Sequence, residues 1–244
     1  MNWRALQWRS LKTRVTLFTL AIFLVGTWSL ALLASHQLRH DMRQLLGDQQ
    51  FATVSLMATE VDRDLLERMQ GLRSVAQGIT PQLFGDPVLM QRFLQERPLF
   101  QSQFSGGTFV TAADGTAIAS LPLSVGRVGV NYLDRDHVAS ALRQGRTTVS
   151  EPVVGKKLKT PVISMATPIR DVQGQVVGAL VGVTDLSKPS FLNRIEENRY
   201  GKTGAYFLVD VKSRLIITSS SRARVLEPLA EVGVTPSLDR FVQG

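Results

Sequence analysis

The first strong pattern along the chain is an uninterrupted apolar segment near the N-terminus. Residues 15–34 contain no charged side chain. A helix of this length, at ~1.5 Å per residue, spans the ~30 Å hydrocarbon core of a bilayer. We therefore predict a transmembrane helix. A cleaved signal peptide is the alternative, but its apolar core usually has only ~7–15 residues, and no small-x-small cleavage site follows this segment.

Beyond the apolar segment, hydrophobic residues recur at steps of three and four, the spacing of one stripe along a helix. No proline occurs before Pro81, so we expect a stalk helix over residues 35–80, closed by Pro81 and weakened at Gly71 and Gly78. The stripe can pack against the chain's own domain or against a second copy as a dimer seam. Both kinds of packing can occur at different positions along the helix. The stripe consists of Phe51, Val54, Ala58, Val61, Leu65, Met69, Leu72, Ala76 and Ile79.

Strand signals begin after a polar stretch with a helical piece around residues 88–96. Residues 108–111 and 116–119 flank a turn that contains Asp114-Gly115. An Asp-Gly pair between two apolar runs is a strong signal for a β-hairpin. We therefore predict the first hairpin of a sheet here.

A second hairpin is predicted from residues 161–169 and 175–185, with its turn at residues 171–174. The second of these strands is apolar almost throughout, so it should be central in the sheet and covered on both faces. The order of strands and a short helix between the hairpins predicts an α+β domain, an antiparallel sheet with helices on one side.

The short helix between the hairpins is expected over residues 136–144. Asp134 or Asp136 is the expected N-cap, because a carboxylate there accepts hydrogen bonds from free backbone N–H groups. Gly145 is the expected C-terminal stop.

The first hairpin recurs near the C-terminus. Residues 204–210 and 214–219 repeat the pattern of residues 107–111 and 116–120, with Phe207 in the place of Phe109. We therefore predict two related modules in tandem. The second copy lacks a closing hairpin, which would leave an edge and an apolar face uncovered, so we expect the chain to be a piece of a longer protein.

The distribution of basic residues predicts how the chain is oriented in the membrane and does not indicate a nucleic-acid partner. The formal net charge is +8, but much of the excess is a basic cluster before the apolar segment, so nucleic acid is not expected as a partner. Such a cluster stays in the cytoplasm and interacts with membrane lipid, which places residues 36–244 outside. The cluster is Arg4, Arg9, Lys12 and Arg14, and tryptophans near the ends of the segment are Trp3, Trp8 and Trp28.

The sequence offers little for metal or covalent chemistry. There is no cysteine, which excludes disulfides and thiolate metal sites. His36 and His40 lie one helical turn apart with Asp41 beside them, a spacing that permits metal ligation, but polar residues at this position mark the membrane boundary. We expect no metal and no other cofactor.

Several short motifs follow the predicted transmembrane helix, in this order: Asn131-Tyr132-Leu133-Asp134-Arg135-Asp136, Ser150-Glu151-Pro152-Val153-Val154-Gly155, Thr167-Pro168-Ile169-Arg170-Asp171, Val177-Gly178-Ala179-Leu180-Val181-Gly182-Val183-Thr184-Asp185-Leu186 and Gly201-Lys202-Thr203-Gly204-Ala205-Tyr206. In this order and after such a helix, they resemble the double-Cache sensor domain of bacterial receptors, a PAS-like fold.

The resemblance implies a chain anchored in the bacterial inner membrane with a periplasmic sensor. Its parts would be a cytoplasmic tail (1–14), a transmembrane helix (15–34), a stalk helix (35–80), a membrane-distal Cache module (81–190) and a partial membrane-proximal module (191–244). In such receptors a diguanylate cyclase, a histidine kinase or a chemotaxis domain gives the output. No motif of these outputs is present, so we expect no enzymatic activity and no catalytic residue in this chain.

The resemblance also implies ligand-binding residues in the distal module. Tyr132, Arg135 and Asp185 match the pattern of members that bind amino acids, whereas His137 and Val138 stand where those members have an aromatic pair. The ligand is therefore either amino-acid-like or another small carboxylate metabolite. A guanidinium suits a carboxylate. Alternatively, Arg135 pairs with Asp134 or Glu151, and Asp185 caps the next turn.

We expect Lys156, Lys157 and Lys159 to form a solvated basic loop. Three functions remain open: a receptor that signals through its stalk, as a homodimer; a membrane-tethered extracytoplasmic enzyme; and a structural coiled-coil tether. A closed, polar-lined pocket near Arg135 favours the receptor. An open groove with paired acids favours the enzyme, and no pocket favours the tether.

Overall fold

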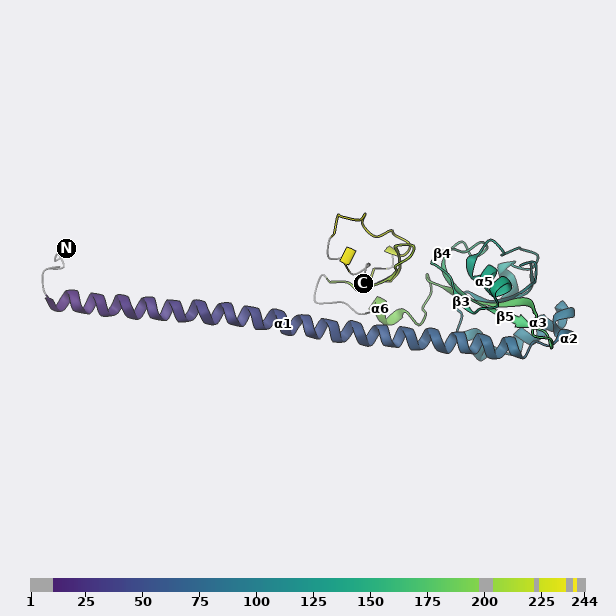
Figure 1. Cartoon of the computed structure of the whole chain (residues 1–244), viewed down its shortest axis with the longest axis horizontal. Coiled ribbons are helices and arrows are strands. Elements are labelled where there is room, and N and C mark those ends of the chain that lie inside the picture. Colours follow the sequence, from purple (N-terminus) through teal and green to yellow (C-terminus); the bar gives the residue numbers. More distant parts are fainter. Residues whose placement is uncertain (1–10, 198–203, 222–223, 236–238, 241–244) are drawn as a thin grey trace. The chain divides into compact units, whose positions relative to one another are not determined.

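The computed structural model describes residues 11–197, 204–221, 224–235 and 239–240. Most of the predicted basic tail, the tryptophans at positions 3 and 8, and residues 201–203 of the last motif lie outside the described residues. The first element is α1 (Leu11–Gln77), a continuous helix of 67 residues (Figure 1). It runs through two units, residues 1–56 and residues 57–244.

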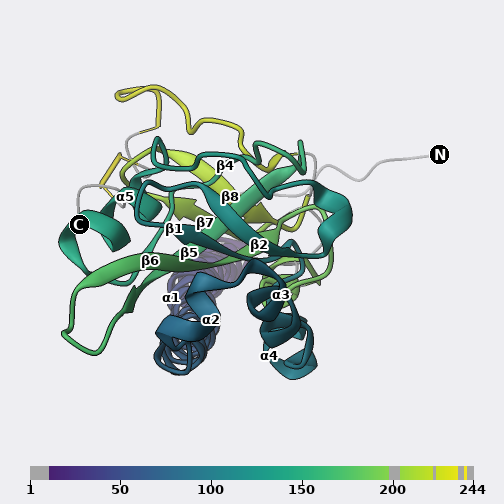
Figure 2. The ribbon, with the colours of Figure 1, turned by 90° about the vertical axis from the view of Figure 1, so that its right-hand side faces the viewer.

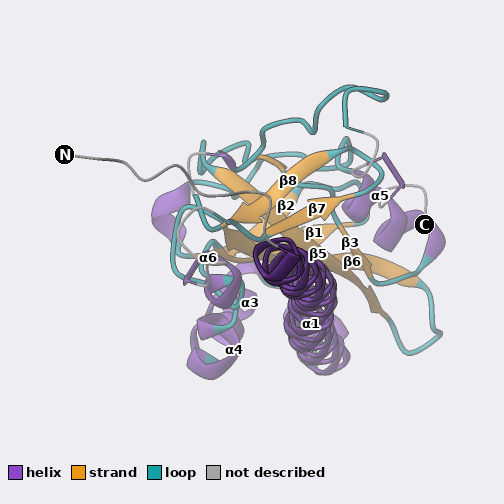
Figure 3. Cartoon of the chain, turned by 90° about the vertical axis from the view of Figure 1, so that its left-hand side faces the viewer, coloured by secondary structure: helices purple, strands orange, loops and turns teal. Residues whose placement is uncertain are grey.

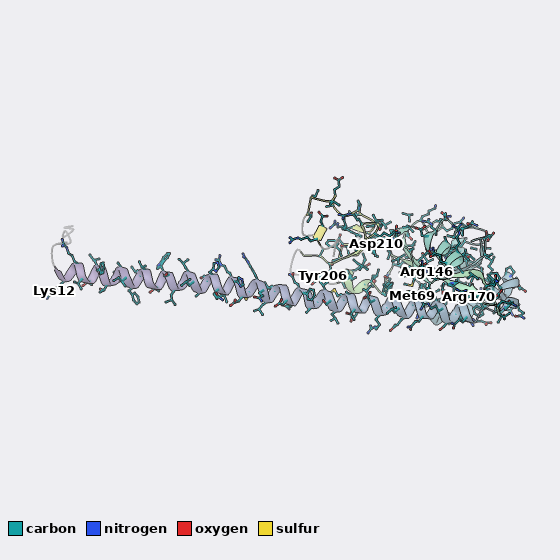
Figure 4. The ribbon with its side chains drawn as sticks, viewed as in Figure 1. Lys12, Met69, Arg146, Arg170, Tyr206 and Asp210 are labelled. Atoms are coloured by element: carbon teal, nitrogen blue, oxygen red, sulfur yellow. The ribbon has the colours of Figure 1, made fainter. Side chains whose placement is uncertain are left out.

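The first unit consists of the N-terminal part of α1. Its side chains project around the helix (Figure 4), and large apolar side chains such as Phe23 and Leu30 are about 70% exposed. An 18-residue window of this helix reaches a mean hydropathy of 2.2, with none of it buried. By length and composition the helix is able to cross a membrane, as the apolar pattern predicts.

The second unit contains a six-stranded antiparallel sheet with the order β2-β1-β6-β5-β3, in which β4 also pairs with β5. Both predicted hairpins are present, and β6 lies between β1 and β5 with nearly every residue buried, as its apolar sequence predicts. The bounds are β1 (Gly107–Ala112), β2 (Ala117–Leu121), β3 (Thr148–Val149), β4 (Val153–Val154), β5 (Pro161–Arg170) and β6 (Val176–Asp185).

Helices cover both faces of this sheet, which corrects the expectation of helices on one side. The C-terminal part of α1 packs with α2 (Pro81–Gly85), α3 (Pro87–Gln95) and α4 (Pro98–Ser102) on one face, and α5 (Asp136–Gln144) lies on the other (Figures 2 and 3). Successive strand residues point to opposite faces. Accordingly Leu180 joins the core under α1 and α3, whereas Val181 joins the core under α5.

The stripe on the stalk helix is only partly covered. Leu72 and Ala76 are buried in the core under the sheet, and Val61 is buried in a separate core with Ile163 and Leu192, which confirms packing against the chain's own domain. Phe51 and Val54, farther toward the N-terminus, are 77% and 45% exposed. The dimer seam at that height stays a prediction.

The ends of two predicted helices differ from expectation. α1 stops at Gln77, and Pro81 begins α2 instead of merely closing α1, because proline suits the first turn of a helix. On α5 the N-cap is Arg135 with no side-chain cap, so neither predicted aspartate caps it, whereas Gly145 ends it in the left-handed conformation as predicted.

The predicted repeat is visible in the strand register. β7 (Phe207–Asp210) and β8 (Leu215–Ser219) form a third hairpin, which corresponds to the first one, and a short helix, α6 (Asn193–Glu197), precedes it. In both hairpins the register shifts at the same place, after Val110 in one and after Leu208 in the other. Phe109 and Phe207 therefore occupy equivalent positions, although Phe109 is 2% exposed and Phe207 is 42% exposed.

Candidate ligand-binding site

A cavity opens on the face of the sheet that α5 covers. Its volume is about 30 Å³, and the empty space that includes the mouth open to solvent is about 390 Å³. Apolar side chains of three strands, Phe109, Val162 and Val183, form its floor, and two loops form its walls. The full lining is Phe109, Arg127, Tyr132, Arg135, His137, Val153, Gly155, Lys156, Lys157, Leu158, Val162, Ser164 and Val183.

Arg127 is the most buried cation of this lining, at 3% exposure. It follows the short helix η1 (Leu123–Val125) and the left-handed Gly126, which turn the chain back toward the sheet. Nη2 donates to the carbonyl of Gly106 at 2.5 Å, and the guanidinium lies 5.5 Å from the ring centroid of Phe109. Nη1 is buried without a hydrogen-bond partner. Burial lowers the pKa of Arg127, the effect expected for a cation without a counter-ion.

Tyr132 stands beside Arg127. Its ring packs on Phe109 with 4.6 Å between centroids, and its hydroxyl is buried beside the guanidinium of Arg127 without a hydrogen bond of good geometry. Burial raises the pKa of the phenol, while the nearby charges of Arg127 and Arg135 oppose that rise. The two arginines therefore both lie close enough to Tyr132 to act on it.

Arg135 takes neither of the acidic partners that the sequence suggested. Asp134 pairs with Lys156 at 2.6 Å, and Glu151 pairs with Lys212 at 2.6 Å. Arg135 instead donates to the carbonyl of Val154 at 3.3 Å. Among the described residues no carboxylate lies within ion-pair distance of its guanidinium, so its charge is available to a ligand.

His137 is buried in the first turn of α5, at 7% exposure. Desolvation, with a smaller contribution from the charge of Arg135, lowers its pKa to about 4. The imidazole is therefore neutral at pH 7 and offers one donor and one acceptor to the cavity.

The basic loop contributes to the cavity wall, and Lys156 is half-buried and paired rather than solvated, whereas Lys157 and Lys159 are exposed as expected. Lys156 and Lys157 line the cavity, and Lys159 does not. Nζ of Lys156 is held by Asp134 and by the carbonyl of Asn131 at 2.8 Å. The paired Lys156 thus fixes the loop against the segment that carries Tyr132.

Asp185 is buried at the end of β6, at 1% exposure, but it is not part of the lining. Its Oδ1 accepts hydrogen bonds from the backbone N–H and the hydroxyl of Ser187, at 3.0 and 2.6 Å. Nζ of Lys188 lies 3.8 Å from Oδ2. The carboxylate therefore caps the next turn, and its contact with a ligand stays a prediction.

The lining of this cavity is basic, although Arg135 and His137 also border a neighbouring groove lined by Asp134, Asp136 and Glu151. No aspartate or glutamate lines the cavity itself within the described ranges, whereas four basic residues do. The structure therefore places Tyr132, Arg135 and His137 in the lining of one cavity. Arg127 also lines this cavity, and the sequence analysis did not identify it. A lone arginine in a loop carries no local signal for burial, because its burial depends on how the loop folds over the sheet.

Solved structures with a similar fold are sensor domains. The ligand-binding domain of the amino acid chemoreceptor PctC of Pseudomonas aeruginosa PAO1, in complex with GABA, is 25% identical with a TM-score of 0.58, over 75% of this chain and 80% of that one. PctB of the same organism, in complex with L-Arg, is 25% identical with a TM-score of 0.58, over 71% of this chain and 65% of that one.

The sensor domain of the V. cholerae histidine kinase DctB has a TM-score of 0.57 at 17% identity, over 80% of this chain and 74% of that one. No family model and no curated protein matches the sequence. The fold is that of Cache-type extracytoplasmic sensor domains, which confirms the resemblance. The similar structures are ligand-binding modules of chemoreceptors and of a sensor kinase.

Proposed function

We propose that this chain is the ligand-sensing part of a single-pass membrane receptor and that its cavity binds a small anion. The observation that carries the anion proposal is the pairing of a cationic, acid-free lining with buried donors that lack partners, Nη1 of Arg127 and the hydroxyl of Tyr132. Buried polar groups are normally paired. A bound anion would supply the missing acceptors.

The proposal favours an anion over a zwitterionic amino acid. An α-ammonium group buried in the cavity would need a carboxylate. Asp185 is the carboxylate that the sequence suggested for this contact, but it accepts hydrogen bonds from Ser187. Of the two ligand classes that the motifs left open, a carboxylate metabolite fits the lining better.

Orientation, assembly and signalling are part of the same proposal. The sensor unit lies outside the cytoplasmic membrane of a bacterium, and ligand binding shifts an equilibrium between arrangements of the stalk helix in a homodimer. Exposed apolar residues of the stalk, such as Phe51 and Val54, support a partner along that helix.

An enzymatic reading finds little support in the cavity. Ser164 and His137 both line it. However, a histidine with a pKa of about 4 is a weak general base at pH 7, and no carboxylate of the lining orients it. The absence of activity nevertheless stays a prediction.

The test is a thermal-shift screen of the full chain in detergent with small carboxylates, amino acids, amines and neutral polyols. We expect anions to stabilise the chain, by about 2.7 kcal/mol at a hundredfold excess over the dissociation constant. Arg135→Ala should weaken binding roughly ten- to a hundredfold, because it removes a charge-assisted contact.

Arg143→Ala is the matched control, since Arg143 is an exposed arginine on α5, the helix that Arg135 precedes, and does not line the cavity. It should leave the shift unchanged. Stabilisation by amines or polyols but by no anion would contradict the proposal. So would equal ligand shifts in wild type and Arg135→Ala.

A further inference from the structure

Arg127 is buried as a charged group without a counter-ion among the residues that the structure describes, whereas Arg135 is only half-buried and keeps part of its hydration. A guanidinium at 3% exposure has lost most of its hydration, and burying a charge is costly unless it is paired. One Nη2 hydrogen bond and the ring of Phe109 compensate in part. In the described part of the chain no carboxylate lies within ion-pair distance of Arg127.

The two unpaired arginines lie on different elements and at different depths. Arg127 lies in the loop after η1 and is buried, whereas Arg135 precedes α5 and is only half-buried. The charges of both arginines act on Tyr132 and oppose the rise in the pKa of its phenol. An anion held at Arg135 alone would leave Nη1 of Arg127 and the Tyr132 hydroxyl without acceptors, so a single carboxylate does not complete the site.

We propose that Arg127 is a second anion-binding residue of this cavity and that the ligand is a dicarboxylate, with one carboxylate at Arg127 in the interior and the other at Arg135 near the mouth. This inference rests on the proposed function, because it names the ligand class of the same site. The Tyr132 hydroxyl donates to the inner carboxylate. Each guanidinium presents the planar fork that a carboxylate accepts in bidentate fashion.

The test uses matched probes on the full chain in detergent: the linear dicarboxylates from malonate to adipate, the monocarboxylates of equal chain length, and the corresponding ω-amino acids. Dissociation constants are measured by isothermal titration. We expect at least one dicarboxylate to bind roughly ten- to a hundredfold more tightly than its monocarboxylate, because it makes a second charge-assisted contact. The ω-amino acids should bind no better than the monocarboxylates.

Two variants locate the inner contact. Arg127→Met keeps a side chain of similar length and should reduce dicarboxylate affinity to the level of the monocarboxylate, whose own affinity should hardly change. Tyr132→Phe removes only the hydroxyl. It should weaken dicarboxylate binding several-fold and raise the melting temperature of the unliganded chain, because the buried hydroxyl has no partner there.

A purely structural role for these residues predicts a different result. In that case both variants lower the unliganded melting temperature and leave the preference for dicarboxylates intact, which overturns the inference. If Arg127→Met fails to fold, Tyr132→Phe decides by the same two readouts.

The inference and the proposed function fail in separate ways. If a monocarboxylate binds as tightly as every dicarboxylate, or if another anion binds and no dicarboxylate does, Arg127 is not a second site and the anion sensor stands. If no anion of any kind binds, the proposed function itself is wrong.

Discussion

At the scale of single residues, His137 makes the clearest link between the cavity and pH. Its pKa of about 4 in the folded chain lies below the value of about 6.5 in the unfolded chain. Between these values the unfolded state binds the extra proton, so folding stability is complete above pH ~6.5 and falls as the pH drops toward 4.

We therefore expect the free energy of unfolding to fall by about 2 kcal/mol between pH 7 and pH 5, and by about 3 kcal/mol in all below pH 4. His137→Phe should remove most of this loss. Denaturant titration at pH 7 and pH 5 measures it, with His40→Gln as the control, since His40 is exposed. An unchanged pH dependence in His137→Phe would show that the imidazole is not held neutral by burial.

The same residue scale shows what the sequence could reveal about the site. Tyr132 and Arg135 were found because they stand in a motif of local order. Arg127 was missed, since its importance comes from burial under a loop. Asp185 was placed correctly at the end of a strand, but sequence alone could not choose between a ligand contact and the hydrogen bonds to Ser187 that the structure shows.

At the scale of elements, strand β6 depends on two positions where an aromatic ring lies on its backbone. A Cβ at Gly182 would come within 2.3 Å of the ring of Phe104, and one at Gly178 within 2.6 Å of the ring of Phe84. Glycine in a strand often marks such a close approach. Because both rings belong to the layer on the α1 side, these glycines fix how closely that layer packs on the sheet.

Gly182→Ala should destabilise the chain by about 1–3 kcal/mol, because the Phe104 ring and the strand must move apart. Gly85→Ala is the matched control, since no atom outside its immediate neighbours lies within 4 Å of the added methyl group. Its stability should stay within about 0.5 kcal/mol of wild type. Thermal unfolding compares the two, and equal melting temperatures would contradict the packing argument.

Most elements were predictable because their signals are local. The Asp114-Gly115 turn predicted the first hairpin, and the apolar run of β6 helped to predict the second. Gly145 predicted the end of α5. The side of the sheet on which α5 packs could not be predicted, because periodicity identifies the apolar face of a helix but not the sheet face that covers it. The N-cap prediction was wrong for Asp134 because its carboxylate pairs with Lys156.

At the scale of the whole molecule, the chain combines a helix able to cross a membrane with a unit that has the Cache-type fold. The cavity lies on the face of the sheet opposite to the one on which the C-terminal part of α1 packs. In the proposed receptor, the central sheet is the layer between the ligand and the stalk helix, and its β6 residues Leu180 and Val181 belong to the cores on either side.

Hydrogen–deuterium exchange of the full chain, with and without the tightest anion from the screen, tests the central claim most directly. Bound anion should slow exchange in residues 127–137 and 153–164, which carry the polar wall of the cavity, and should leave residues 15–34 unchanged. Protection confined to another surface, such as the cleft lined by Arg73 and Arg170, or no protection at saturating anion, would contradict the account.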